Sequence, residues 1–270
     1  MRTTLHLACL AGVSMLAMAA APALAAEDAA DDGLGTIVVT ATKRAIALDQ
    51  TPIAAIAVSG KDLAAANAQS LSDYITRLPG VVFNDYQPGV SEVIIRGISA
   101  TTYHEQGQTT VGYYLNEVPL VEPGFPIGIP DVDTFDLNRV EVLRGPQGTL
   151  FGSSTLGGLV NYVVNTADTS KIDAAASGLI GSTKNSHGEV NYAAKAMVNV
   201  PLIADKLAVR LVALQRFDAG YLDNPGTGVR GSNDFRTRGL RGSIVLTPTS
   251  ATKISYLSSW QDTYLEDQTY

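Results

Sequence analysis

The side chains that could do chemistry in this sequence are few and lie far apart. His104 and Glu105 are neighbours that could both ligate a metal ion, and Asp131 and Asp133 could offer loop oxygens to Ca²⁺. One histidine with one carboxylate falls short of a metal site, so a solvated loop histidine is the simpler interpretation. The Asp-x-Asp spacing is common in proteins and is weak evidence for calcium. We therefore predict neither a bound metal nor a cofactor.

The patterns typical of enzymes are missing from the sequence as well. Residues 136–163 are rich in glycine, but no Gly-Lys-Ser/Thr closes the stretch into a phosphate-binding loop. Residues 152–156 lack the final glycine of a nucleophile elbow. Neither a Ser/His/Asp set nor a pair of catalytic acids rises above the background, so we do not expect an enzyme.

The same glycine-rich stretch does predict structure. The alternation of Val140 and Val142 with Leu143 following indicates a strand, and an apolar run resumes over residues 159–164. Glycine supplies positive φ and lets two backbones approach closely, so we predict a strand, tight turns and a second strand. The glycines between the two apolar runs are Gly145, Gly148, Gly152, Gly157 and Gly158.

In its length and order, residues 136–163 resemble the end of the plug domain of TonB-dependent outer-membrane receptors. The resemblance runs from residue 36 to about residue 262, and it implies an α+β plug domain over residues 46–171. It also implies that residues 172–270 begin a transmembrane antiparallel β-barrel. The family imports scarce solutes, most often an iron–siderophore complex, and vitamin B12, an oligosaccharide or an aromatic compound is the alternative. The rival class is a barrel enzyme or adhesin that does not import.

The N-terminal 25 residues predict a secretory signal peptide. A short basic start is followed by an apolar run over residues 7–19, and Ala23-Leu24-Ala25 fits a small-x-small cleavage site. The only cysteine, Cys9, lies inside this segment. A mature chain beginning at Ala26 would therefore have no disulfide or thiolate chemistry.

Residues 26–45 predict a disordered leader that contains a recognition segment. Removal of Arg2 takes the formal charge from −7 to −8, and no basic patch offsets phosphate repulsion, so nucleic-acid binding is disfavoured. The β-branched run that follows is an ordinary first strand on the simplest interpretation. The more specific interpretation, which we favour, is that this run is a strand that pairs with the sheet edge of a partner protein. In the family this position holds the TonB box, which TonB binds, and it matches Thr36, Ile37, Val38, Val39, Thr40 and Ala41. We expect residues 37–40 to be poorly ordered until TonB binds.

The rest of the plug region predicts short helices and strands. Residues 51–58 and 90–97 are expected to be strands, and alanine-rich residues 61–68 are expected to be helical. Ser70 to Asp73 forms a capping-box pattern that opens a helix ending at Pro79-Gly80. Residues 113–120 resemble a hairpin of the family, with Asn116-Glu117 where Asp-Gly is common. Glu tolerates positive φ poorly, which leaves the turn type open.

From residue 173 the sequence alternates between apolar and polar side chains, with a period of two. The alternation is clearest in residues 189–200 and 251–262, and it recurs in residues 207–213, 235–247 and 174–182. Short connections alternate with longer polar ones, as in outer-membrane barrels. A soluble β-sandwich would alternate too, but the predicted signal peptide and the plug resemblance favour the barrel.

Five strands cannot close such a barrel, because an open edge facing lipid leaves backbone groups unpaired. Plugged transporters have about 22 strands, so we expect this chain to be a fragment of a longer receptor. The resemblance implies a monomer in the outer membrane, with lipid around the barrel and the N-terminus in the periplasm.

Two further sets of residues have roles by this resemblance. Plug loops that point to the cell exterior would contact the substrate, and these loops carry Tyr103, His104, Glu105, Gln106 and Phe125. Arg96 and Arg144 each precede a glycine at the end of an apolar strand, and family members hold such arginines against glutamates of the barrel wall. We expect those two arginines to lock plug to barrel through strands beyond Tyr270.

Overall fold

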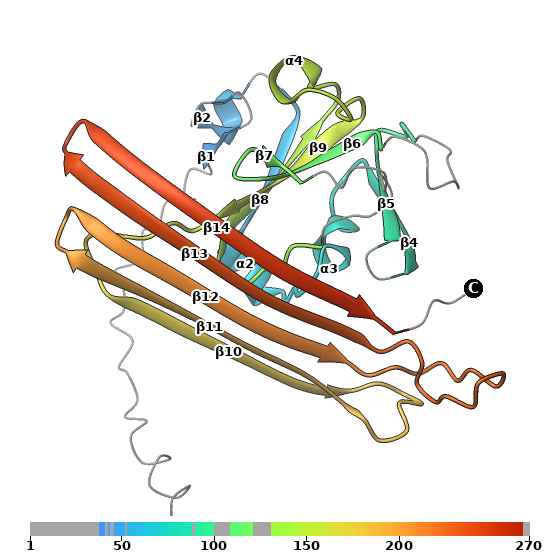
Figure 1. Ribbon diagram of the computed structural model, residues 1–270. Coiled ribbons are helices and arrows are strands. Elements are labelled where there is room, and N and C mark those ends of the chain that lie inside the picture. The colour runs from blue at the N-terminus through green and yellow to red at the C-terminus, as the bar shows by residue number, and fades with distance from the viewer. Residues whose placement is uncertain are drawn as a thin grey trace, which may run out of the picture. The chain divides into compact units, whose positions relative to one another are not determined.

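Figure 1 shows the computed structural model, which describes residues 38–40, 43, 46–51, 53–87, 90–99, 109–120 and 131–266. All of them belong to one compact unit, residues 37–270. The predicted signal peptide, Thr36, Ile37 and Ala41 of the predicted TonB box, and the predicted substrate residues all lie outside the described residues. Among the helices that are described, none has the length and apolar character needed to cross a membrane.

A mixed five-stranded sheet forms the centre of the plug region. Strand β8 is antiparallel to both β3 and β9, and β6 is parallel to β9. The core cluster beneath the sheet joins Val140 and Val142 of β8 to Leu63 and Ile75 of two helices, all at most 1% exposed. In sheet order the strands are β3 Ala55–Ser59, β8 Leu137–Arg144, β9 Gly158–Val164, β6 Val111–Leu115 and β7 Val118–Pro119.

Shorter elements surround this sheet (Figure 1). Two antiparallel pairs stand beside it, β1 with β2 and β4 with β5. The bounds of the paired strands are β1 Val38–Val39, β2 Ile46–Ala47, β4 Val81–Gln87 and β5 Val90–Ile95. The helices are η1 Leu48–Gln50, α2 Gly60–Ala65, α3 Ser72–Ile75 and α4 Gly148–Phe151.

The glycine-rich stretch forms strand, turns and strand, as predicted, with the one-turn helix α4 between β8 and β9. A Cβ atom on Gly158 would lie 2.2 Å from the Leu143 carbonyl oxygen, so no other residue fits there without moving the backbone. The Gly145 amide donates to the Gly157 carbonyl over 2.8 Å, which closes the base of the turn. Glycine is therefore required where the two strands come together.

Helix α2 begins at a side-chain cap, and both α2 and α3 are shorter than predicted. Ser59 Oγ accepts a hydrogen bond from the Asp62 amide over 3.1 Å and so caps α2. Asp73 accepts from the amides of Gln69 and Ser70 over 2.7 and 2.9 Å, which is the carboxylate half of the predicted capping box. Helix α3 ends at Ile75 rather than at the predicted Pro79-Gly80, and turns connect it to Gly80.

The hairpin between β6 and β7 turns with positive φ at both central residues. Asn116 has a φ of 45° and Glu117 a φ of 69°, the sign pattern of a type I′ turn. The Glu117 amide donates to Asn161 Oδ1 over 3.1 Å, and the Asn116 amide donates to the Tyr162 carbonyl over 2.8 Å. These bonds to β9 hold the glutamate in a conformation that it would not favour alone.

The predicted C-terminal strands are present as one antiparallel sheet in sequence order, with long neighbouring strands in Figure 1. Short turns join β11 to β12 and β13 to β14, while residues 183–189 and 219–234 form the longer connections. This pattern confirms the expected barrel strands. Their bounds are β10 Asp173–Ser182, β11 Val190–Ile203, β12 Leu207–Asp218, β13 Phe235–Thr249 and β14 Thr252–Leu265.

The two faces of this sheet differ in chemistry as the alternation predicts. On β11 the polar side chains Lys195 and Asn199 are buried, at 5% and 0% exposed, while Tyr192 and Val198 are each 40% exposed. The buried face therefore carries the polar residues, and it meets the plug region. The exposed face carries the apolar ones.

Candidate functional site

Part of the predicted TonB box is bound to the plug region. Val38–Val39 pairs with Ile46–Ala47 as an antiparallel ladder. The Val39 side chain is fully buried in a cluster that includes Tyr114, Phe151 and Leu159. The expectation that residues 37–40 stay poorly ordered until TonB binds is therefore wrong for Val38, Val39 and Thr40. An apolar pocket for Val39 and a polar one for Thr40 explain why these residues are ordered.

Glu141 on β8 provides the polar pocket for Thr40. The Thr40 amide donates to Glu141 Oε1 over 2.8 Å, and the Thr40 hydroxyl donates to Oε2 over 3.0 Å. Arg139 Nε and Asn161 Nδ2 donate to the same carboxylate over 2.8 and 3.3 Å. Glu141 is only 1% exposed, and a carboxylate so buried requires such partners. We call Glu141, Arg139 and Asn161 the Glu141 site.

Lys43 fastens the chain just after this point. Its Nζ lies 3.0 Å from Glu117 Oε2 at the hairpin turn and 4.2 Å from the centroid of the Phe151 ring. Both contacts are partly exposed, and each adds modestly to the binding of the segment. The N-terminal segment is thus tied to β8, to α4 and to the β6–β7 hairpin.

A second cluster joins the plug region to the barrel strands. Lys195 Nζ of β11 lies 2.6 Å from Asp133 Oδ2, and the two side chains are 3% and 4% exposed. Asp133 Oδ1 also accepts from the Phe135 amide over 2.8 Å. Both carboxylate oxygens therefore have donors, as burial of a charge demands.

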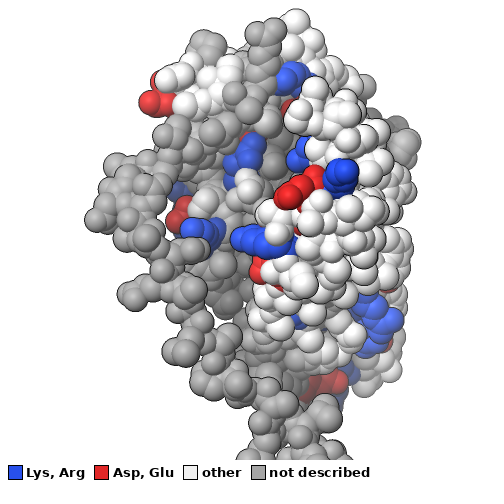
Figure 2. All heavy atoms as spheres, turned by 90° about the vertical axis from the view of Figure 1, so that its left-hand side faces the viewer, with Lys and Arg blue, Asp and Glu red and all other residues white. Residues whose placement is uncertain are grey.

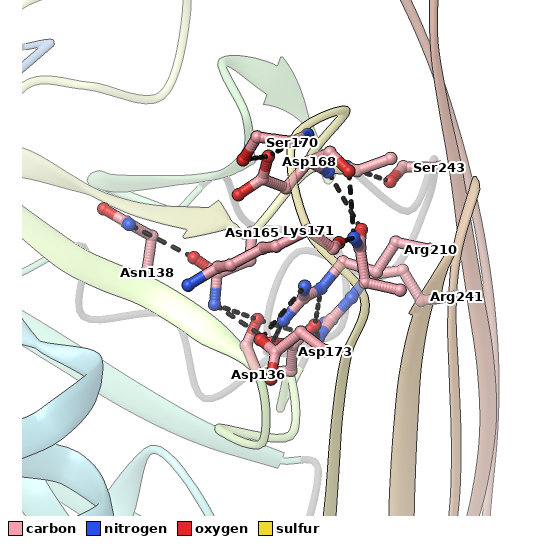
Figure 3. A network of polar contacts seen from close by, with 12 residues as sticks. Asp136, Asn138, Asn165, Asp168, Ser170, Lys171, Asp173, Arg210, Arg241 and Ser243 are labelled. Atoms are coloured by element: carbon pink, nitrogen blue, oxygen red, sulfur yellow. Dashed lines mark hydrogen bonds and ion pairs between the residues drawn. The ribbon is translucent and has the colours of Figure 1, made fainter. Parts of the chain in front are cut away.

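Asp136 meets two arginines of neighbouring strands (Figure 3). Arg210 of β12 donates through Nε and Nη2 to the two Asp136 oxygens over 2.8 and 2.5 Å, a bidentate pair. Arg241 of β13 donates to the carbonyls of Phe135 and Asp136 over 2.7 and 3.2 Å. Asp136 has a φ of 59°, unusual for a residue other than glycine, and these contacts hold it there.

The connection from β9 to β10 is bound to the same wall. The Ala167 amide donates to Ser243 Oγ over 2.8 Å, and Asn199 Nδ2 donates to the carbonyls of Asp168 and Lys171 over 2.9 and 2.7 Å. In Figure 2, basic and acidic side chains of the described residues lie next to one another on the visible face. The contact between plug region and barrel strands is therefore polar and ionic.

Asp131, the first aspartate of residues 131–136, accepts hydrogen bonds but forms no ion pair within the described part of the chain. Its Oδ1 accepts from the Leu71 amide over 2.7 Å, and its carbonyl accepts from Gln261 Nε2 over 2.6 Å. Burial raises the pKa of the Asp131 carboxyl to about 6. The carboxylates of Asp131 and Asp133 thus serve separate partners. Within the described residues no group of three or more potential metal ligands comes together.

Arg96 and Arg144, the predicted plug–barrel lock, lie together at one end of the plug sheet. Arg144 Nη1 donates to the Pro79 carbonyl over 3.1 Å, and its Nε is buried without a hydrogen-bond partner. The Arg96 guanidinium lies against Gly145, where an added Cβ would come within 2.8 Å of Nη1. Neither arginine forms an ion pair with a carboxylate among the described residues. Their role as a lock stays a prediction.

The ionic contacts of Lys195, Arg210 and Arg241 were not predicted as a group. The sequence does contain a signal for them, since each of these three basic residues stands at a polar position of a strand in which polar and apolar side chains alternate. Residues 131–136 hold three aspartates in six positions, immediately before β8. Basic residues at the polar positions of consecutive strands, together with an acidic segment earlier in the chain, would have indicated that the strands contact this segment.

Comparison with known proteins supports this architecture. Residues 47–159 match the family described as TonB-dependent Receptor Plug Domain. The pesticin receptor of Yersinia pestis is 30% identical over 226 residues, which are 83% of this chain and 31% of that receptor. The vitamin B12 transporter of Vibrio vulnificus is 26% identical over 72% of this chain and 30% of the transporter. The chain thus spans about a third of the length of these relatives.

Solved structures show the same fold. The ferric yersiniabactin uptake receptor of Yersinia pestis aligns with a TM-score of 0.66 and 24% identity, over 78% of this chain and 32% of that one. The ferripyoverdine receptor of Pseudomonas aeruginosa aligns with a TM-score of 0.67 and 18% identity, over 84% and 27%. Both alignments extend beyond the residues that the family match covers, and so include barrel strands.

Proposed function

Because the chain belongs to the TonB-dependent receptors, we propose that it is the plug and first barrel strands of an outer-membrane receptor that imports a scarce solute with energy delivered by TonB. The observation that carries this proposal is the set of ion pairs and hydrogen bonds between residues 131–136 and strands β11–β13. A plug fastened in this way to the barrel wall closes the lumen at rest. Passage of a solute then requires work on the plug, and that work is what TonB supplies.

An iron–siderophore complex is the substrate that we propose. The solved structures of the ferric yersiniabactin uptake receptor and of the ferripyoverdine receptor support it. Vitamin B12 is the second candidate, because one relative is a vitamin B12 transporter. Tyr103, His104, Glu105, Gln106 and Phe125 are proposed to contact the solute from the extracellular side.

The exposed face of the long strands supports a place in the outer membrane. Leu240 is 58% exposed and Trp260 is 55% exposed, and both project from the face opposite to the plug region. Large apolar side chains on the outer face of a barrel contact lipid. We propose that the barrel spans the outer membrane as a monomer, with the plug in its lumen.

TonB is proposed to bind residues 36–41 by adding a strand. Val38 already forms a ladder with β2 in the structure, so the segment has the extended backbone that strand addition needs. Val38→Pro removes a ladder donor and fixes φ, so it should abolish energy-dependent uptake while leaving binding of solute at the cell surface unchanged. Radio-iron uptake from ferric yersiniabactin, and uptake of labelled vitamin B12, measure this directly.

A strain lacking TonB provides the matched control. It should bind the solute normally and import none, whichever of the two probes the receptor accepts. Full uptake by the Val38→Pro variant in a TonB-containing strain would contradict the assigned TonB box. Full uptake without TonB, or catalysis on a bound solute without uptake, would favour the rival class instead.

A further inference from the structure

Two exposed arginines, Arg236 and Arg238, lie on the outer face of strand β13. Exposed and buried side chains alternate along this strand, and Arg241 lies on the buried face, where it contacts the plug region. Arg236 and Arg238 therefore point away from the plug. Strand β13 pairs with β12 on one side and with β14 on the other (Figure 1). The strands that border these two arginines thus all belong to the described residues.

The position of Arg238 along the strand corresponds to the edge of a membrane. Leu240, Ile244 and Leu246 follow it on the same face, and all three are exposed. From Arg238 to Pro248, beside the short turn, the strand is about 33 Å long at about 3.3 Å per residue. A strand tilt of about 40° converts this length to a height of about 25 Å, which is the height of the apolar band of outer-membrane barrels. Arg238 therefore lies where the band ends, on the side of the longer connections.

Arg236 is held in a fixed position at this edge. Its Nη2 donates to Asp234 Oδ2 over 2.5 Å, and its guanidinium carbon lies 5.5 Å from the centroid of the Phe217 ring. The Asp234 side chain is 7% exposed, whereas that of Arg236 is 48% exposed. A buried carboxylate and an aromatic ring thus orient the guanidinium while it remains open to the outside. A guanidinium oriented in this way is suited to bind an anion.

Arg238 has no charged partner among the described residues. Its cross-strand neighbours are Gln215 on β12 and Asp262 on β14. Neither Asp262 nor another described carboxylate forms an ion pair with it. Gln215 Nε2 donates to the Tyr192 hydroxyl over 3.2 Å. An arginine on the outer face of a barrel is tolerated at the membrane interface and is strongly destabilising at the midplane. The charge of Arg238 is therefore available to a partner from outside the chain.

We propose that Arg236 and Arg238 bind the phosphate group of a lipid headgroup in the outer leaflet of the outer membrane. The inference rests on the proposed place of the barrel in that membrane, since the longer connections of such barrels face the cell exterior. Guanidiniums bind phosphate oxygens through paired hydrogen bonds. Asp262 repels phosphate but accepts hydrogen bonds from hydroxyl groups. The headgroup that fits therefore carries hydroxyls as well as phosphate, as a phosphorylated glycolipid does.

Lipid binding by the purified full receptor tests the proposal. Native mass spectrometry measures how much lipid A, a glycolipid that carries phosphate on its sugars, the receptor and its variants retain. The double variant Arg236→Gln/Arg238→Gln should bind lipid A about tenfold more weakly, because it lacks both charges but keeps polar side chains. Arg230→Gln is the matched control and should bind normally, since Arg230 is exposed on the longer connection before β13 and lies outside the strand.

Two probes identify the chemical group that is recognised. Lipid A without its phosphates should bind the unmodified receptor as weakly as lipid A binds the double variant. Inorganic phosphate should not displace lipid A at the same concentration, which separates a lipid headgroup from a free anion. The double variant Arg236→Lys/Arg238→Lys keeps both charges and should retain part of the affinity. It provides a second comparison if the glutamine variant does not fold.

Equal retention of lipid A by the glutamine variant and by the unmodified receptor would overturn the proposal. So would an equal loss in Arg230→Gln, which would reflect the overall charge of this end of the barrel, or equal binding of the lipid without phosphates. Displacement by inorganic phosphate would indicate a free-anion site and would overturn the lipid site. Because the experiment measures lipid binding and not uptake, absence of TonB-dependent import would overturn the proposed function without changing this result.

Discussion

Replacing Lys195 with methionine should release Asp133 from the barrel wall, while Arg210 and Arg241 still hold Asp136. The side chains of Lys195 and Asp133 are 3% and 4% exposed, and their charged atoms are 2.6 Å apart. At an effective dielectric constant of about 20 the attraction at this distance is about 6 kcal/mol, and most of it offsets the cost of removing both charges from water. Met has similar length, so the change removes the charge with little change in packing.

The cost of the single change comes from the carboxylate left behind. A buried charge that loses its partner typically destabilises a protein by about 3–5 kcal/mol. Asp133 keeps its bond from the Phe135 amide, 2.8 Å long, so we expect a value near the lower end, about 3 kcal/mol. Hydrogen exchange of the amides of residues 131–137 in the detergent-solubilised protein should then accelerate by about a hundredfold.

A second variant separates loss of the pair from loss of packing. Adding Asp133→Asn to Lys195→Met removes both charges and retains an oxygen for the Phe135 amide. The double variant should recover to within about 1 kcal/mol of the unmodified protein, and so be about 2 kcal/mol more stable than Lys195→Met alone. Lys253→Met, at an exposed position of β14, is the matched control and should change nothing. Unchanged exchange in the single variant, or no recovery in the double variant, would refute the reasoning.

Two further outcomes follow from buried carboxylates of the plug. Burial raises the pKa of the Asp131 carboxyl to about 6. The protonated carboxyl therefore stabilises the folded state fully at a pH below the ordinary carboxyl pKa of about 4, and this stabilisation is lost as the pH rises through 6. Asp131→Asn keeps an acceptor for the Leu71 amide, and it should raise the melting temperature at pH 7 and flatten its dependence on pH between 4 and 7; an unaltered pH profile would contradict this. Glu141→Gln replaces an acceptor of charge-assisted bonds, so it should free Val39 and Thr40 at a cost of about 1.5–3 kcal/mol. Limited proteolysis and binding of the TonB C-terminal domain without solute should both increase, and unchanged values would show that Glu141 does not hold the segment.

The sequence was sufficient to predict elements whose signal is local. The alternation around Lys195 and Asn199 predicts a strand with a polar and an apolar face, because a strand has a period of two whatever it packs against. The glycines near Leu143 and Leu159 predict tight turns, because the requirement for glycine arises within the same stretch of chain. These elements agree with the structure in position to within a few residues.

Such local patterns could not predict contacts between residues that lie far apart in the sequence. Thr40 meets Glu141 a hundred and one positions later, and nothing in the β-branched run around Thr40 indicates a buried carboxylate as partner. The hairpin turn is a similar case: Glu117 is a poor choice for positive φ, yet Asn161 and Lys43 supply the bonds that hold it. Local preference was outweighed by tertiary contacts, as is common at ends and turns.

Strand β8 connects the two sets of ionic contacts. Glu141 binds Thr40 from the middle of this strand, and Asp136, one residue before the strand begins, is bound by Arg210 of the barrel. If Thr40 is displaced, its hydrogen bonds to Glu141 therefore transmit the displacement to β8. Strand β8 is in turn fixed to the barrel wall at Asp136. Because Asp136 is strained at positive φ and is held there by paired charges, loss of those charges would release both the strain and the attachment. The predicted TonB box thus rests against the strand that begins next to Asp136, the residue that the two barrel arginines bind.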